Sequence, residues 1–306
     1  MIAVVGSLNM DLVVSTPNIP RPGETVMGRD FKQVPGGKGG NQAAAAAKLG
    51  GDVKMIGCVG EDDMGRVLKA SLERDGVDVR TVREVSGTST GIAAIAVGDS
   101  GDNSITVAPG ANYSLTAGDI EASRGLIAEA DVLLTQLEIP MQAVEKALRF
   151  AKEAGNMTIL NPAPASALSV EIMKCTDILT PNETELEILS GCPADTEENI
   201  REAGRKLIFA GVGELIVTLG GSGCMHITRD GARHYPAYEV TAVDTTAAGD
   251  SFNGALAVCL DRGMSVEDAI AFAMKVGAMT VTKEGAQTSL PALAEVEAFE
   301  QWLCSQ

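Results

Sequence analysis

The stretch DTTAAGDSFNGA, from Asp244 to Ala255, has the residue types needed to hold a phosphate group. A strand-like segment at 240–243 precedes it, small residues at 247–249 follow two β-branched threonines, and an apolar run comes next. This order predicts a strand, a tight turn and a helix. The first amides of a helix lack intrahelical partners and lie at the positive end of its dipole, so they bind anions. Asp250 is then either a dipole partner in the first turn or a general base acting on a hydroxyl.

Two polar residues near the N-terminus are spaced to bind vicinal hydroxyls. Asn9 and Asp11 follow the apolar run Ile2 to Val5, which predicts a buried strand. On extended backbone, residues two apart point the same way. The pair could therefore bind a sugar, because open parallel sheets bind ligands beyond the carboxyl ends of their strands. An Asx turn that closes a loop is the alternative.

The glycine-rich segment GGKGGNQ, from Gly36 to Gln42, precedes an alanine-rich helix. It is not a P-loop, because the first glycine of that motif is missing and a glycine follows the lysine where Ser or Thr would hold magnesium. Glycines beside a helix start instead let the backbone approach a polar ligand closely. Lys38 is either a ligand contact or a solvated loop charge.

Together, DTTAAGD with SFNGA and, about two hundred residues upstream, GGKGGNQ resemble the two signatures of the ribokinase-like (PfkB) carbohydrate kinases. The resemblance covers essentially the whole chain. It implies an α/β fold, a Rossmann-like three-layer sandwich with a mostly parallel central sheet and a small β-sheet lid. It also implies phosphate transfer from ATP to the primary hydroxyl of a pentose, with D-ribose giving ribose 5-phosphate as the expected reaction. Asp250 would be the base, and the anion hole would be formed by the amides of Ala247, Ala248 and Gly249.

The resemblance also implies a set of ligand contacts. For the sugar it points to Asn9, Asp11, Gly37, Lys38, Gly39, Gly40, Asn41, Glu138 and Asp250. For the nucleotide it points to Asn182, Thr218, Gly220, Gly221, Gly223, Gly249 and Met274. The glycine cluster lacks the spacing of a dinucleotide-binding fingerprint, and Met274 could equally be a core filler.

Metal ions complete what the resemblance implies. Glu185, in an N-x-x-E motif that also reads as a helix start, would order Mg²⁺ through water. A monovalent cation, expected to be K⁺, would be caged by two polar segments, through Asp244, Thr246, Thr280, Lys283, Gly285 and Ser289. His226 and His234 have no third ligand at a metal spacing, so we expect them to be structural or exposed.

Composition limits the partners and the compartment. The formal net charge of −17 argues against a nucleic acid partner. The six cysteines show no C-x-x-C spacing, which favours reduced thiols in a cytosolic protein. The apolar run at Ile2 to Val5 is too short for a signal peptide or a membrane span. We therefore expect a cytoplasmic protein with no membrane partner.

As the resemblance implies, we expect the elements that position these residues to form one ribokinase-like kinase domain over residues 1–306. From residue 131 onward, short apolar strands alternate with longer helices, which indicates βαβ units and a parallel sheet. Polar residues follow several of these strands, as at Glu138 and Asn161. Proline-rich β segments and a hairpin signal predict a lid from about 12–35 and 88–108. An exposed apolar lid would favour a homodimer through the lid.

Three other functions stay open at this point. The nearest is a kinase of the same family acting on deoxyribose, fructose, a nucleoside or ketodeoxygluconate. A non-catalytic sugar sensor on the same fold is disfavoured, because Asp250 and the small-residue turn before it are intact. A nicotinamide-dependent dehydrogenase is also disfavoured, because no glycine fingerprint follows Ile2 to Val5.

Overall fold

The central sheet of the computed structural model, which describes residues 1–304, runs through the middle of the molecule. Within those residues it has nine strands in the order β13-β12-β11-β10-β9-β8-β1-β4-β5, and only the pairs β11–β12 and β12–β13 are antiparallel. The strands are β1 (Ile2–Val5), β4 (Val53–Gly60), β5 (Asp78–Val85), β8 (Val132–Thr135), β9 (Met157–Leu160), β10 (Ile178–Leu179), β11 (Glu214–Thr218), β12 (Cys224–Ile227) and β13 (Ala232–Tyr235).

Helices cover both faces of this sheet, because its central strands are apolar on both sides. In β1, Ile2 and Val4 pack into one core cluster, and Ala3 and Val5 pack into the other. The first cluster includes α1 (Lys38–Lys48), α2 (Asp63–Arg74), α9 (Ala248–Asp261), α10 (Val266–Thr280), α11 (Leu293–Glu297) and α12 (Phe299–Leu303). The second includes α3 (Ala117–Ala122), α4 (Arg124–Glu129), α5 (Met141–Ala154), α6 (Val170–Lys174), α7 (Glu183–Ser190) and α8 (Glu197–Ala210).

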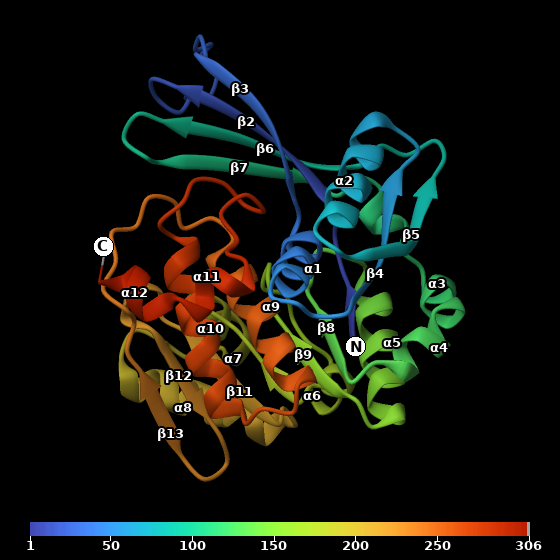
Figure 1. The fold of residues 1–306 in the computed structure, drawn as a ribbon, viewed down its shortest axis with the longest axis vertical. Helices are drawn as coiled ribbons and strands as arrows, with labels where there is room; N and C mark the ends of the chain where they lie inside the picture. The colour runs from blue at the N-terminus through green and yellow to red at the C-terminus, as the bar shows by residue number, and fades with distance from the viewer. Residues whose placement is uncertain (305–306) are drawn as a thin grey trace.

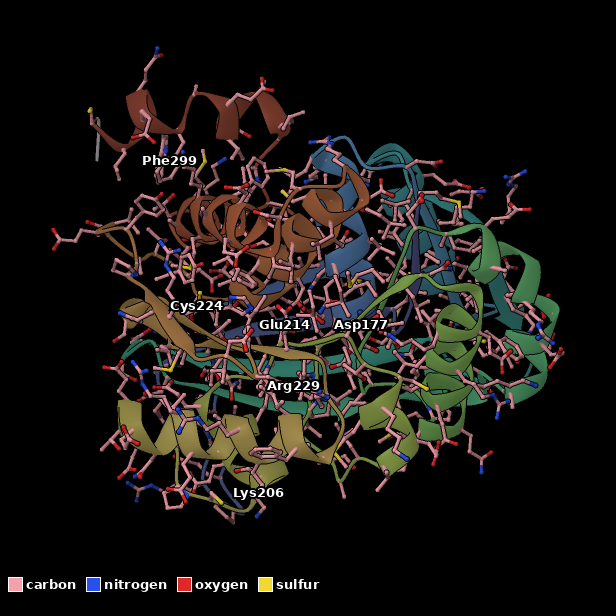
Figure 2. The ribbon with its side chains drawn as sticks, turned by 90° about the horizontal axis from the view of Figure 1, so that it is seen from below. Asp177, Lys206, Glu214, Cys224, Arg229 and Phe299 are labelled. Atoms are coloured by element: carbon pink, nitrogen blue, oxygen red, sulfur yellow. The ribbon has the colours of Figure 1, made fainter. Side chains whose placement is uncertain are left out.

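Figure 2 shows the three layers edge-on. Phe299 lies in the layer above the sheet, Lys206 lies in the layer below it, and Glu214 and Cys224 lie on strands between the two. The predicted three-layer α/β sandwich with a mostly parallel sheet is therefore confirmed.

A second, smaller sheet projects from the sandwich (Figure 1). Its order is β3-β2-β6-β7, formed by β2 (Asn9–Thr16), β3 (Asp30–Gly36), β6 (Gly91–Gly98) and β7 (Asn103–Ala108). The predicted hairpin is present as the antiparallel pair β6–β7. β2 starts four residues after β1 ends, so the small sheet rises directly from the carboxyl edge of the large one. The predicted small sheet is thus present, and its boundaries as a lid remain a prediction.

One predicted strand is absent. Residues 240–243, before the DTTAAGD motif, form no strand. The amides of Val243 and Asp244 instead donate to the carbonyl oxygen of Val281, at 2.7 and 3.1 Å. β13 is an edge strand of the sheet, but these two hydrogen bonds tie the segment to the end of α10 instead of to that edge. The segment therefore crosses to the loop after α10.

No helix within residues 1–304 combines the length and the apolar character that crossing a bilayer would require.

Candidate active site

The candidate site lies where the first turns of α1 and α9 meet the carboxyl ends of the parallel strands, as expected for an open α/β sheet. The two helices pack closely because Gly254 of α9 faces the backbone of α1. A Cβ there would lie 2.7 Å from the carbonyl oxygen of Gln42 and from the Cβ of Ala45. Small residues on both helices thus bring the two glycine-rich motifs side by side.

Asp250 lies at the centre of this junction and is only 7% exposed. Its Oδ2 accepts a hydrogen bond from Asn41 Nδ2 at 2.9 Å, and its Oδ1 accepts one from Gln42 Nε2 at 2.9 Å. Both donors come from the first turns of α1. The carboxylate is therefore held by two neighbouring amides and faces the space before α9.

The turn before Asp250 has an unusual backbone. Ala247, the N-cap of α9, has φ of 61°, and among residues 1–304 it is the non-glycine residue with a positive φ. This left-handed conformation is costly for a residue with a Cβ and is found at sites that need a fixed backbone direction. A Cβ added at Gly249 would meet no atom within 4 Å, so this part of the turn borders open space. The turn thus leaves room for a ligand at Gly249, while the Ala248 N–H donates to the Thr245 carbonyl oxygen at 3.3 Å.

A cavity of about 220 Å³ borders this turn. It is lined by the turn residues 247–250 together with Lys38, Asn161, Asn182, Glu185 and Thr218. Eight predicted site residues from four separate segments therefore share one space, and its charged residues are one lysine and two carboxylates. The predicted phosphate-handling residues are thus brought together.

Of the two interpretations of Lys38, the structure favours a ligand contact over a solvated loop charge, because Lys38 lines the first cavity. Burial would lower the pKa of its ammonium group, but the carboxylates of Asp250, Glu138 and Glu185 outweigh burial and raise the pKa. The lysine therefore stays charged while it lines the cavity. A fixed positive charge beside the open turn suits a phosphate group.

Glu185 serves a helix cap and also faces the cavity. Its Oε2 accepts from the Asn182 N–H at 2.9 Å, and Asn182 Oδ1 accepts from the Glu185 N–H at 2.8 Å, which forms a capping box at the start of α7. Burial raises the pKa of Glu185, and the Asn182 amide and Lys38 oppose the rise. The two interpretations of the N-x-x-E motif are thus compatible.

A second cavity, of about 210 Å³, opens beside Asn9 and Glu138. Glu138 Oε2 accepts from Ser7 Oγ at 2.5 Å and from the Lys38 N–H at 3.1 Å, so Glu138 lies next to the first cavity as well. Apolar side chains, including Val107 of β7 and Leu137, form the other walls. A polar end and apolar walls suit a sugar with hydroxyls on one side.

Asn9 is oriented by a residue that the sequence did not single out. Asn112, buried in the 3-10 turn Gly110–Ser114, donates to Asn9 Oδ1 at 2.7 Å and also bonds the backbone of Leu8 in both directions. Asn9 Nδ2 then points toward Glu138 Oε2, 3.5 Å away. The amide group of Asn9 is thus fixed toward the second cavity.

Asp11 lies on the face of the small sheet that covers the site. The strand register places Asp11 beside Ala93 and Ala93 beside Val107, so Asp11 and Val107 share a face. Burial, together with the negative charges of Glu138 and Asp250, raises the pKa of Asp11 to about 7. Three predicted carboxylates are therefore close enough to influence one another.

The glycines of GGKGGNQ have different surroundings. Gly37 has φ of 85°, and a Cβ there would lie 2.5 Å from the Asn9 nitrogen. The amides of Gly39 and Gly40 donate to Ser7 Oγ and Ser7 O, at 3.3 and 2.8 Å. These two hydrogen bonds hold the start of α1 against the residues that follow β1. A contact of Gly39 and Gly40 with the sugar remains a prediction. Within residues 1–304, Asn41 Oδ1 is buried without a hydrogen-bond partner.

The predicted nucleotide residues divide into two groups. Thr218 lines the first cavity and bridges to Asn182, and the exposed Gly220 and Gly221 follow it with open space around them. Gly223 is needed for packing, because a Cβ there would overlap the carbonyl oxygen of Tyr235. Met274 packs against the core and lines neither of the two cavities described above.

The segments predicted to cage a cation are brought together by Asp244. Its Oδ1 accepts from the Thr246 N–H at 2.8 Å and its Oδ2 from the Gly285 N–H at 2.9 Å. Burial would raise the pKa of Asp244, but these hydrogen bonds hold it below its usual value. Lys283 turns away to pair with Glu295 at 2.8 Å.

The hydroxyls of the predicted cation segments point to the backbone. Thr280 Oγ1 donates to the Val276 carbonyl oxygen and Ser289 Oγ to the Ala286 carbonyl oxygen, each at 2.8 Å. Any contribution of Thr280 or Lys283 to a cation would therefore come from their carbonyl oxygens.

Sequence reasoning missed several buried amides. Beyond Asn112, these are Gln42, Gln136 and Asn253, whose Nδ2 donates to the Gly249 carbonyl oxygen at 2.8 Å. Only Gln42 had a signal, its place next to Asn41 in the glycine-rich segment.

A fold and a site of this kind define a sugar kinase, and the comparison with protein families agrees. The model of the pfkB family carbohydrate kinases matches residues 1–293. The chain belongs to this family, and it is a carbohydrate kinase. The resemblance predicted from the two signatures is thereby confirmed.

Several relatives of known name are similar over nearly the whole chain. A ribokinase of Haemophilus influenzae is 41% identical over 97% of both chains, and a deoxyribokinase of Salmonella typhi is 40% identical over 99% of this chain and 98% of its own. The structure of Arabidopsis thaliana ribokinase complexed with ribose and ATP is 33% identical, covers 97% of both chains and has a TM-score of 0.90. An E. coli protein described as a ribokinase II in complex with ATP and Mg²⁺ is 25% identical, covers 98% of this chain and 99% of its own, and has a TM-score of 0.83.

Proposed function

We propose that this carbohydrate kinase is an ATP-dependent ribokinase, which transfers the γ-phosphoryl group of ATP to the primary hydroxyl, O5, of D-ribose. The observation that carries the proposal is Asp250, a buried carboxylate that lines the first cavity beside an open turn of amides. The ribokinase relatives and the ribose and ATP bound to the Arabidopsis protein support the choice of substrates.

The proposed reaction is a direct transfer. The sugar O5–H gives its proton to Asp250 while O5 forms a bond to the γ-phosphorus, and the bond from that phosphorus to the ADP oxygen breaks. Amides of Ala247, Ala248 and Gly249 hold the charged oxygens, and Lys38 adds a positive charge. Phosphoryl transfer needs mainly positioning and charge stabilisation, which fits a site built largely from backbone.

The residues present fit Mg²⁺ held mainly by water and substrate. Among residues 1–304 no group of three or more His, Cys, Asp or Glu is placed to hold a metal ion, so the chain offers no complete protein cage. Mg²⁺ commonly binds through one or two carboxylates together with substrate phosphates. We assign that carboxylate role to Glu185, acting through water, because it lines the cavity with Lys38. When bound, Mg²⁺ would neutralise the phosphate charge.

ATP would extend from the first cavity past the end of β11. Thr218 and Asn182 lie at the cavity and would contact the phosphates, and Gly220 and Gly221 leave room for the rest of the nucleotide. Gly223 would allow the tight backbone packing of the turn after β11 and would not itself contact ATP. Met274 stays a proposed adenine contact.

The sugar would bind between the two cavities. Asn9, Asp11 and Glu138 supply fixed polar groups for its hydroxyls, Gly37 lets the backbone approach, and Asn41 Oδ1 lacks the donor that a hydroxyl would provide. Buried polar groups reject an analogue that leaves them unpaired.

We therefore expect kcat/KM for D-ribose to exceed that for 2-deoxy-D-ribose by roughly 10²-fold or more. A panel of ribose, deoxyribose, fructose, ketodeoxygluconate and nucleosides with coupled ADP detection checks this. The deoxyribokinase relative makes deoxyribose the second candidate, and a higher kcat/KM for it would reassign the substrate. Ribose binding without ADP release would instead indicate a sugar sensor.

A monovalent cation, K⁺, remains part of the proposal. Asp244 ties the 244–246 segment to the loop after α10, so carbonyl oxygens from both segments lie near the start of α9. Ser289 and Gly285 would contribute from that loop.

The small sheet supports a homodimer. Val13, Ile95 and Ile105 form a row across β2, β6 and β7, and Ile105 is 54% exposed. We expect Ile105→Asp to convert a dimer to a monomer in analytical ultracentrifugation, because it places a charge in this apolar row. Phe209→Ser is the matched control, because Phe209 is exposed on α8 and should not change the mass. A wild type that sediments as a monomer at micromolar concentration would contradict the dimer.

The cytoplasm is the proposed compartment. All six cysteines, which lie within the described residues, are free thiols, as is usual in a reducing compartment.

A further inference from the structure

A chain of buried side-chain amides leads away from Asp250 into the protein. Gln42 Nε2 donates to Asp250 Oδ1 at 2.9 Å, and Gln136 Nε2 donates to Gln42 Oε1 at 2.6 Å. Both glutamines are fully buried, and neither lines the two cavities described above. A role of the two glutamines in the reaction would therefore act through Asp250.

The direction of this chain is fixed by its first member. A carboxylate oxygen only accepts hydrogen bonds, so Gln42 must turn its NH₂ group toward Asp250. The second proton of the same nitrogen goes to Asn161 Oδ1 at 3.1 Å. Asn161 can only accept there, because its own Nδ2 donates to the Thr180 carbonyl oxygen at 3.0 Å. Gln42 is therefore oriented from two sides.

The orientation of Gln42 also fixes the orientation of the Gln136 side-chain amide. Gln42 Oε1 faces Gln136, so Gln136 must present its NH₂ group, and its own oxygen turns away. That oxygen, Oε1, is buried and has no hydrogen-bond partner among the residues that the structure describes. It lies where a side chain at Gly6 would be, since a Cβ on Gly6 would overlap it. Buried acceptors are normally paired, so an unpaired one needs a reason.

We propose that Gln42, held by Gln136, is a positioning residue that fixes which oxygen of Asp250 takes the proton. With Oδ1 bound to Gln42, the carboxyl group cannot rotate about its terminal bond. Oδ2, which accepts one bond from Asn41, then keeps its second lone pair directed toward the sugar hydroxyl. The unpaired oxygen of Gln136 is the consequence of keeping Gln42 in this orientation. The inference rests on the proposed role of Asp250 as general base.

Methionine substitutions test the proposal, because Met has a similar volume and shape and cannot donate. We expect Gln42→Met to lower kcat about 10- to 50-fold, and Gln136→Met about 3- to 10-fold. KM for sugar and for ATP should change less than threefold in both. The double variant should match Gln42→Met within twofold, because Gln136 acts only through Gln42.

Thr176→Val is the matched control. It also removes a buried hydrogen bond, from Thr176 Oγ1 to the Ile172 carbonyl oxygen at 2.8 Å, but at the amino-terminal end of β10, away from the site. Its kcat should equal that of the wild type. A structural role for the glutamines would instead lower the amount of folded enzyme and leave kcat per folded molecule unchanged.

Three results would overturn the proposal: a Gln42→Met enzyme with kcat within twofold of wild type, single effects that multiply in the double variant, or losses confined to KM. If Gln42→Met does not fold, Gln136→Met decides alone, and an unchanged kcat for it counts against the proposal. Asp250→Asn separates this inference from the proposed function. Loss of turnover in Asp250→Asn with normal turnover in Gln42→Met would contradict only the positioning role.

Discussion

Asp250→Asn should lower kcat by about 10²- to 10⁴-fold while the binding of sugar and of ATP stays within a few-fold of wild type. The asparagine has nearly the same shape but cannot accept the proton of the sugar hydroxyl. The open turn of amides and Lys38 are untouched, so the charge of the transferred phosphate is still stabilised. The loss therefore falls on the proton-transfer part of the barrier.

The Asp250→Asn substitution also disturbs the hydrogen bonds around residue 250. Asn41 and Gln42 both donate to the wild-type carboxylate, one to each oxygen. An asparagine at 250 offers one oxygen and one NH₂ group, so one of the two donors then faces another donor. Either that amide flips or its hydrogen bond is lost, and we expect a fall in thermal stability of a few degrees.

The measurement is steady-state turnover with coupled ADP detection, combined with calorimetric titration of sugar and of a non-hydrolysable ATP analogue. Titration is needed because it shows that the substrates still bind. Thr176→Val serves again as the control for a buried polar change outside the site. If turnover of Asp250→Asn stays within a few-fold of wild type, the assigned base is wrong.

The sequence predicted those parts of the molecule that depend on local patterns. Alternating strands and helices indicated the parallel sheet, and the two glycine-rich motifs indicated both helix starts. Residues 240–243 show the limit of such patterns. Their mainly β-branched side chains favour a strand, yet the amides of Val243 and Asp244 bond the carbonyl oxygen of Val281, a long-range contact that no local pattern reveals.

The buried amides could not be predicted for a different reason. Gln42, Gln136 and Asn161 come from three segments far apart in the sequence, and only the packing of α1 against α9 and the strand ends brings them together. Apart from the place of Gln42 next to Asn41, these side chains carry no signal of burial in the sequence. Lys38 shows the same limit, because its charged surroundings depend on Glu138 and Glu185 from distant strand ends.

Asp11 combines a raised pKa with a proposed place in the sugar site, and Asp11→Asn should separate binding from stability. We expect the sugar KM to rise roughly 10²-fold and kcat to fall less than tenfold, because a charged acceptor of sugar hydroxyls is replaced by a neutral one. Steady-state kinetics with varied sugar measures this. Sugar affinity equal to that of wild type would remove Asp11 from the binding site.

The pH dependence of sugar binding gives a second test of the same variant. The pKa of Asp11 is raised to about 7, and sugar hydroxyls that donate to Asp11 favour its ionised form. Sugar affinity of the wild type should therefore increase as the pH rises from 6 to 8 and level off above. Asp11→Asn should lack this dependence. A wild-type affinity that is flat over this range would show that Asp11 is not titrating in contact with the sugar.

The free energy of unfolding of the wild type should fall as the pH rises, whereas its sugar affinity should increase. The folded-state pKa of Asp11 lies above the ordinary value of 3.8, so the folded protein binds the proton more tightly than the unfolded chain does. The stability that this proton contributes is complete below about pH 4 and is lost as the pH rises through about 7. At pH 8 the wild type thus holds a half-buried, ionised Asp11 near the negative charges of Glu138 and Asp250. Asp11→Asn removes that repulsion, so its free energy of unfolding at pH 8 should exceed that of wild type by about 1–2 kcal/mol, with a smaller difference at pH 5. Urea denaturation of both proteins at the two pH values measures this difference in the free energy of unfolding. If the variant is less stable than the wild type at pH 8, Asp11 stabilises the fold and the predicted repulsion is wrong.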